Sequence, residues 1–170
     1  MLALIFCIEC NKKSESDKMY ISNVIKNFYK LDTSIKTRYL NFAGKGKYKS
    51  EKIKKEIEKI KAEPHYKQIK VVYCVDADKI QADPDTNKLN EEIKEYCKKN
   101  NYEFVWFCRN IEDVFLHKTI NNSKEKIKAA KKVGRVGGIG LATEKTLTAT
   151  KLSENKSNLM SVVDKVLQRK

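Results

Sequence analysis

The chain has 170 residues, of which 34% are charged and 41% hydrophobic, and its formal net charge is +14. This length predicts one domain that can bury roughly 70% of the surface of the unfolded chain. No apolar run approaches the ~20 residues that a transmembrane helix needs. The start of the chain lacks the basic residues and the small-residue cleavage site of a signal peptide. We therefore expect a cytoplasmic protein that does not enter a membrane.

The positive charge is concentrated in two segments. Residues 45–70 hold ten lysines against four glutamates, and residues 119–170 hold twelve Lys or Arg against four acids. Residues 71–118 are acidic, with seven basic and ten acidic side chains. Basic segments of this kind are natural sources of contacts to nucleic-acid phosphates. The alternative is that the lysines only keep the helices solvated, since Lys greatly outnumbers the better phosphate ligand Arg.

Four apolar segments are predicted to be strands, and three amphipathic segments between them are predicted to be helices. The strands are residues 1–8, 37–43, 70–76 and 102–108. Apolar residues at helical spacing mark the helices: Ile21, Val24, Ile25 and Phe28, then Ile53, Ile57 and Ile60, then Leu89, Ile93, Tyr96 and Cys97. Ser16 or Asp17 is placed to cap the first helix, and residues 83–85 form a loop and cap before the third. The alternation predicts an α/β fold with a mostly parallel four-stranded sheet flanked by helices, and a functional site beyond the carboxyl ends of its strands.

The pattern weakens after residue 118. Residues 121–132 are a basic helix candidate, residues 133–142 are rich in glycine, and residues 158–167 predict a closing helix. We therefore expect an α/β core over residues 1–118 and a basic, mostly helical extension over residues 119–170 that packs on or beside it. The glycines of residues 134–140 match neither a P-loop nor a dinucleotide-binding fingerprint, so they predict a loop or hinge.

Acidic side chains follow two of the predicted strands. The third strand ends in Asp76 and Asp78, which would share one face of an extended chain, and the first strand ends at Glu9. Mg²⁺ prefers oxygen ligands, keeps several waters and binds one or two carboxylates, so Asp76 with Asp78 is a sufficient protein contribution, and Mn²⁺ is the alternative metal. Glu9 would be a further ligand or the general base toward a water, and its other interpretation is a solvated carboxylate.

A second metal would need more acids, and the candidates are Glu15, Glu112 and Asp113. Candidate phosphate contacts lie at the same predicted edge of the sheet. Lys45, Lys47 and Lys49 surround Gly44 and Gly46 after the second strand, in what is either a phosphate-binding loop or an ordinary turn. Arg109 follows the fourth strand, and its guanidinium can bind two phosphate oxygens at once.

The cysteines and histidines predict no further site. Cys7 and Cys10 form an isolated C-x-x-C, for which packing plus a loop thiol is favoured over a redox motif or a zinc site. His65 and His117 are too far apart in the sequence to suggest a catalytic pair, although His117 could flank the metal site.

Glu9 at the end of the first strand, followed by Asp76-x-Asp78 at the end of the third, resembles the TOPRIM domain of topoisomerases, primases and certain nucleases. Within that family the chain is most similar to RloB-like and abortive-infection proteins and, more distantly, to OLD-family nucleases. In the RloB-like pattern a Thr-Glu and an aromatic residue follow the first acid, and here Ser14-Glu15 and Tyr20 follow Glu9. The resemblance implies a compact parallel α/β fold, magnesium held by the acids, and phosphodiester chemistry.

The RloB-like pattern also places an Asn and an acid after the fourth strand, matched here by Asn110 and by Glu112 or Asp113. Two departures stand beside these matches. Cys10 occupies the position where the family commonly has a glycine, and Ile111-Glu112 stands where a proline and an aromatic residue are usual. The partner domains of primases and topoisomerases are not expected in a chain of this length.

The sequence thus predicts a magnesium-dependent nuclease or phosphodiester-transfer domain that acts on DNA or RNA. The resemblance alone adds phage defence and a separately encoded partner subunit such as an ATPase. In this interpretation Glu9, Asp76 and Asp78 are catalytic. The alternatives are a non-catalytic module that binds nucleic acid or a protein partner, and a phosphotransferase acting on small nucleotides.

Overall fold

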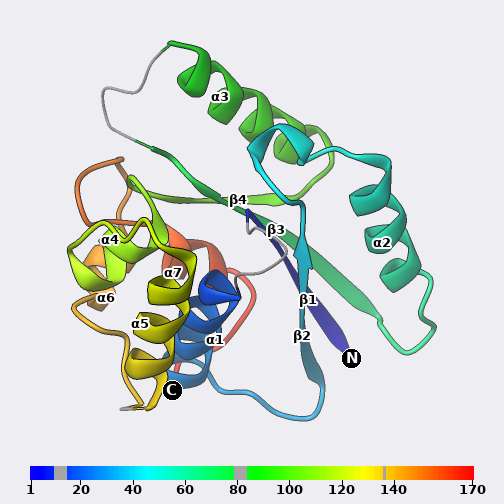
Figure 1. Ribbon diagram of the computed structural model, residues 1–170. Coiled ribbons are helices and arrows are strands. Elements are labelled where there is room, and N and C mark those ends of the chain that lie inside the picture. The colour runs from blue at the N-terminus through cyan, green and yellow to red at the C-terminus, as the bar shows by residue number, and fades with distance from the viewer. Residues whose placement is uncertain (10–14, 79–83, 136) are drawn as a thin grey trace.

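The computed structural model describes residues 1–9, 15–78, 84–135 and 137–170, and it confirms the predicted α/β fold. Four parallel strands form one sheet, and helices cover both of its faces (Figure 1). The strands are β1 (Leu2–Ile8), β2 (Ile35–Asn41), β3 (Gln68–Asp76) and β4 (Glu103–Phe107). The helices are α1 (Ser16–Phe28), the 3₁₀ turn η1 (Lys45–Lys47), α2 (Glu51–Lys61), α3 (Pro84–Lys99), α4 (Ile111–Leu116), α5 (Ser123–Arg135), α6 (Glu144–Leu147) and α7 (Leu159–Val163).

The strand order in the sheet is β2-β1-β3-β4. β1 lies between β2 and β3, with Ile8 opposite Asn41 on one side and Cys74 on the other. The chain leaves β1 toward β2 and then crosses back over β1 to β3, so the direction of winding reverses between β1 and β3. In open α/β sheets, ligands bind beyond the carboxyl ends of strands at such a reversal. Glu9 and Asp76 lie at this place.

Apolar side chains alternate between two hydrophobic cores, one on each face of the sheet. Ile5 of β1 and Tyr73 of β3 face α2 and α3, whereas Phe6 and Cys74 face α1 and the helices after β4. A strand that is buried on both faces reads as a continuous apolar run, which is why β1 and β3 are the most apolar segments of the chain.

Residues 119–170 contribute to the second of these cores. α5 packs on α1, α7 packs on β4, and Leu159, Met160 and Leu167 are buried in the same cluster as Phe6 and Val72. In Figure 1 the chain end lies beside α1, at the side of the molecule opposite α2 and α3.

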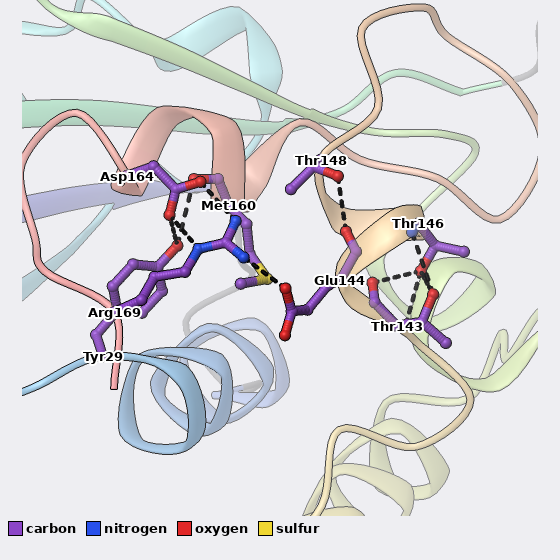
Figure 2. Close-up of polar contacts among 8 residues, drawn as sticks. All are labelled: Tyr29, Thr143, Glu144, Thr146, Thr148, Met160, Asp164 and Arg169. Atoms are coloured by element: carbon purple, nitrogen blue, oxygen red, sulfur yellow. Dashed lines mark hydrogen bonds and ion pairs between the residues drawn. The ribbon is translucent and has the colours of Figure 1, made fainter.

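A polar network holds the chain end in place. The Arg169 guanidinium donates from Nε and Nη2 to the carboxylate of Asp164 at 2.8 and 2.6 Å, and from Nη1 to Glu144 at 2.5 Å. The Tyr29 hydroxyl at the end of α1 donates to the same Asp164 carboxylate at 2.8 Å. Figure 2 shows Arg169 between Glu144 of α6 and Asp164, with Tyr29 on the other side of Asp164. The last residues are therefore tied both to α1 and to α6.

Some predicted boundaries were wrong. The helix predicted over residues 121–132 spans Ser123–Arg135 instead, and it includes Gly134, where an added Cβ would come within 3.2 Å of the Asn23 side chain of α1. The closing helix is only Leu159–Val163, and α6 was not predicted. Glu15, with no side-chain cap, precedes α1 in place of the predicted Ser16 or Asp17 cap. Cys10, Ser14 and Asp83 lie outside the described residues. Within the described residues, no helix has the length and apolar character that crossing a membrane requires.

Candidate metal and phosphate site at the carboxyl edge of the sheet

The acidic side chains at the carboxyl edge form two neighbouring groups. In the first, which we call the Glu9 group, Glu9 and Asp78 surround Lys45. The second, the Asp76 group, consists of Asp76, Asp17, Glu112 and Lys126, whose charges act on one another. Glu9 also raises the pKa of Asp76, which places the two groups next to each other.

Glu9 continues directly from β1 and is partly buried. Its Oε1 accepts a hydrogen bond of 3.1 Å from the backbone N–H of Lys45, at the start of η1. Its Oε2 is buried and has no hydrogen-bond partner in the described structure. Burial raises the pKa of Glu9. The positive charge of Lys45 lowers this pKa, and the negative charge of Asp78 raises it. Glu9 therefore keeps one carboxylate oxygen open to a cation or a proton.

Asp76 is the last residue of β3 and follows the row of Val72 and Cys74 toward the α1 side of the sheet. Its Oδ1 accepts a 3.1 Å hydrogen bond from the Ile111 N–H in the first turn of α4. Asn110 orients this turn, because its side-chain oxygen caps α4 through the Asp113 N–H at 2.9 Å. Burial raises the pKa of Asp76 well above its ordinary value, and Asp17, Glu9 and Glu112 raise it further.

Asp78 does not share the surroundings of Asp76 as the sequence predicted. β3 ends at Asp76, and Asp78 has a left-handed backbone with φ 55°, so the alternation of an extended strand stops before it. An antiparallel bridge to Arg109, which has φ 60°, holds this conformation. The Asp78 carboxylate is half exposed and lies 2.5 Å from the Lys45 Nζ.

Of the two acids of α4, only Glu112 joins the Asp76 group. Its side chain is fully buried, its Oε2 accepts from the Lys126 Nζ at 3.0 Å, and its Oε1 has no partner among the described residues. Asp113 is also buried, but its Oδ1 accepts from the Thr119 hydroxyl at 2.9 Å instead. Adjacent residues of a helix point in different directions, so both acids could not face the same group.

The sequence interpretation missed Asp17 and Lys126. Asp17 lies in the first turn of α1, and burial together with Glu112 raises the pKa of Asp17 to about 7. Its position soon after the first strand was the available signal, but the residue was interpreted as a cap. Tyr20, one turn later, has a buried hydroxyl without a described partner, and burial and the charge of Glu112 raise its pKa. Nothing in the sequence distinguishes Lys126 from the other lysines of α5.

The remaining candidates take other partners. The Lys45 side chain is 10% exposed, and its Nζ also donates to the Asp76 backbone oxygen at 2.5 Å. Its positive charge therefore offsets part of the negative charge of the acids at the carboxyl edge. Lys47 is exposed. The Arg109 guanidinium pairs with Glu154 at 2.8 Å. Glu15 is an exposed residue 3.7 Å from Lys18, and His117 is an exposed residue at the end of α4.

The fit of these residues to Mg²⁺ depends on their open oxygens. Within residues 1–9, 15–78, 84–135 and 137–170, no three His, Cys, Asp or Glu side chains are arranged to hold one metal ion. However, Mg²⁺ needs only one or two carboxylates when water and substrate phosphate complete its shell. Two buried carboxylate oxygens have no partner among the described residues, Glu9 Oε2 and Glu112 Oε1, and the pKa of Asp76 is raised. Both features are expected of a site that binds a cation.

The comparisons with known proteins yield no family. No family model and no curated protein matches this sequence. Among solved structures, the chain is similar to a de novo designed Rossmann fold protein, with 15% sequence identity and a TM-score of 0.32. The match covers 78% of this chain and 96% of the designed protein. The TOPRIM resemblance therefore stays a prediction.

Proposed function

We propose that this protein is a Mg²⁺- or Mn²⁺-dependent phosphodiesterase of the TOPRIM type that acts on DNA or RNA. The observation that carries the proposal is the gathering of Glu9, Asp76, Asp17 and Glu112 at the reversal point of a parallel sheet, with two buried carboxylate oxygens left open. A cluster of buried carboxylates is electrostatically unfavourable unless cations or protons compensate it. The resemblance extends the proposal to phage defence with a separately encoded partner such as an ATPase.

Each residue has a defined role in this proposal. Asp76 and Glu9 hold the metal with Glu112 beside them, while the Ile111 N–H and the Lys45 N–H fix the two carboxylates in place. When bound, the metal supplies Lewis-acid polarisation of the phosphate and a more acidic water. Burial raises the pKa of Glu9, which makes its carboxylate a stronger base toward a water proton. Lys45 contributes positive charge beside the reacting phosphate.

The test is calorimetric titration with Mg²⁺ and Mn²⁺, comparing the wild type with Asp76→Asn/Asp78→Asn. Asparagine keeps an oxygen that can accept the Ile111 N–H bond but removes the negative charge, so the fold should survive. We expect metal binding to be lost in this variant, along with metal-dependent cleavage of plasmid DNA or total RNA. The matched control is Glu56→Ala/Glu58→Ala, which removes two exposed acids of α2 and should bind and cleave as the wild type does. A double variant that still cleaves would refute the site.

A non-catalytic binding module is the second candidate, because the site already contains its own cations. Lys45 pairs with Asp78, and Lys126 pairs with the buried Glu112. In such a module the two ammonium groups would take the place of a metal. Wild-type protein that binds nucleic acid equally with Mg²⁺ and with chelator, and never cleaves it, would favour this candidate.

A further inference from the structure

The outward face of α5 carries a row of cations that no acid in the described structure neutralises. α5 buries Ala130 and Val133 against the core beside α1. Five exposed cations and the half-buried Ile127 line a shallow depression on its other side: Lys124, Lys128, Lys131, Lys132 and Arg135. Lys126 is the one α5 cation with an ion pair among the described residues, and it points inward to Glu112.

The lysines of α2 are arranged differently, because acids of the same helix lie among them. Lys54 pairs with Glu51 at 2.8 Å, and Lys61 pairs with Glu58 at 2.9 Å. The depression on the surface of α2 contains Glu51 and Glu56 beside its lysines. The three glutamates of α2 therefore offset three of its five lysines, whereas α5 has six cations and a single acid, Glu125.

The spacing of the α5 cations fits the backbone of a nucleic-acid duplex. From Lys124 to Arg135 the helix rises roughly 16 Å, so the five cations follow one another at a mean interval of about 4 Å. One strand of a duplex carries a phosphate about every 3.4 Å along its axis. Residues 123–135 contain no aromatic side chain on which an unpaired base could stack, which disfavours a single strand. Ile127 is the single large apolar side chain among the residues that line this face, which is too few for a membrane-surface helix.

We propose that the outward face of α5 docks the phosphate backbone of double-stranded nucleic acid. This inference deepens the proposed function and rests on it for one point, which is that the docked polymer is also the substrate. Lys126 and its ion pair with Glu112 join the same helix to the Asp76 group. The N-terminal half of α5 therefore lies beside the Asp76 group, and a duplex docked along α5 would run toward the carboxyl edge of the sheet.

The test measures binding in chelator, where no metal-dependent cleavage occurs, by the fluorescence anisotropy of a labelled 20-base-pair duplex. The variant is Lys128→Gln/Lys131→Gln/Lys132→Gln, and the matched control is Lys52→Gln/Lys55→Gln/Lys59→Gln on α2. We expect the α5 variant to lose affinity at least about tenfold, and its log–log salt slope to fall by roughly 3. The α2 control should stay within about threefold of the wild type.

Four other outcomes would overturn the inference. Equal losses in the two triple variants would mean that only net charge matters, and an unchanged α5 variant would remove the docking face. Tighter binding of a 20-nucleotide single strand would exclude the duplex. Binding of phosphatidylserine vesicles that depends on α5, without duplex binding, would assign the face to a membrane. By contrast, duplex binding retained by Asp76→Asn/Asp78→Asn, in a protein that never cleaves, would support the docking face and refute the proposed catalytic function.

Discussion

Two residues that are close in the sequence, Asp76 and Asp78, acquire different partners in the structure. Asp76 completes β3 and accepts from the α4 backbone, whereas Asp78 turns into a left-handed conformation and pairs with Lys45. Asp17 is far from Asp76 in the sequence, yet after burial it is the largest influence that raises the pKa of Asp76. Asp78 is not among the main influences on this pKa. Carboxylates from four segments, the end of β1, α1, β3 and α4, thus influence one another.

The raised pKa of Asp17 predicts a stability that depends on pH. Its pKa is about 7 in the folded protein, against an ordinary value of 3.8 for an aspartate in water, so the folded state prefers the protonated form. The stability that this preference contributes is present at low pH and is lost as the pH rises through 7. In chelator, Asp17→Asn should therefore raise the free energy of unfolding at pH 8 by about 2 kcal/mol and change it little at pH 4.

Urea unfolding at the two pH values checks this prediction. Asp32→Asn is the matched control, because hydrogen bonds from Ser34 lower the pKa of the exposed Asp32, so its replacement should give no gain at pH 8. An Asp17→Asn variant with the same pH profile as the wild type would show that Asp17 is not held near its neighbouring carboxylates.

At the level of helices and strands, the network around Arg169 joins three short segments: α6, the end of α7 and the end of the chain. α6 and α7 have four and five residues, too few to be stable without tertiary contacts. Arg169 connects Asp164, after α7, with Glu144 of α6, while Tyr29 anchors Asp164 to the end of α1 (Figure 2).

Arg169→Gln should therefore lower the free energy of unfolding by about 1 to 2 kcal/mol, since a bidentate pair within a network exceeds an isolated surface pair. Lys165→Gln is the control, because it removes a single exposed pair with Glu103 and should cost less than about 0.5 kcal/mol. Equal effects of the two substitutions in urea unfolding would contradict the role of the network.

The turn between α5 and α6 depends on Gly140. It has φ 64°, and a Cβ added there would overlap the backbone oxygen of Phe115 in α4. Gly137 has the same φ but nothing within 4 Å of an added Cβ. Gly140→Ala should therefore destabilise by about 3 kcal/mol or more, and Gly137→Ala by only about 1 kcal/mol. Thermal unfolding of both variants separates backbone strain from steric overlap, and similar melting temperatures would contradict the close approach to Phe115.

Over the entire chain, residues 119–170 are part of the core and do not form an appendage. Leu147, Leu159 and Met160 are fully buried against the sheet face that α1 also covers. In Figure 1, α5, α6 and α7 lie on the α1 side, while α2 and α3 occupy the other. One face of the sheet is therefore completed only by residues that follow β4.

A protein ending at residue 118 should consequently fail to fold cooperatively. It would expose the apolar surface of β3 and β4 that α7 covers, and should bind a hydrophobic dye and lose near-ultraviolet circular dichroism. The full chain should unfold in one transition by both circular dichroism and tryptophan fluorescence. A truncated protein with a sharp thermal transition would show that the first 118 residues are an independent domain.

Local sequence was enough to establish the α/β class, the four strands and the placement of Glu9 and Asp76 at the carboxyl edge. These features follow from apolar runs and from the geometry of parallel strands, which short stretches of sequence encode. Tertiary packing was needed to establish that Asp17, Glu112 and Lys126 join Asp76, and that Asp113 turns to Thr119. These outcomes depend on how α1, α4 and α5 pack against one another, which involves contacts between residues distant in the sequence.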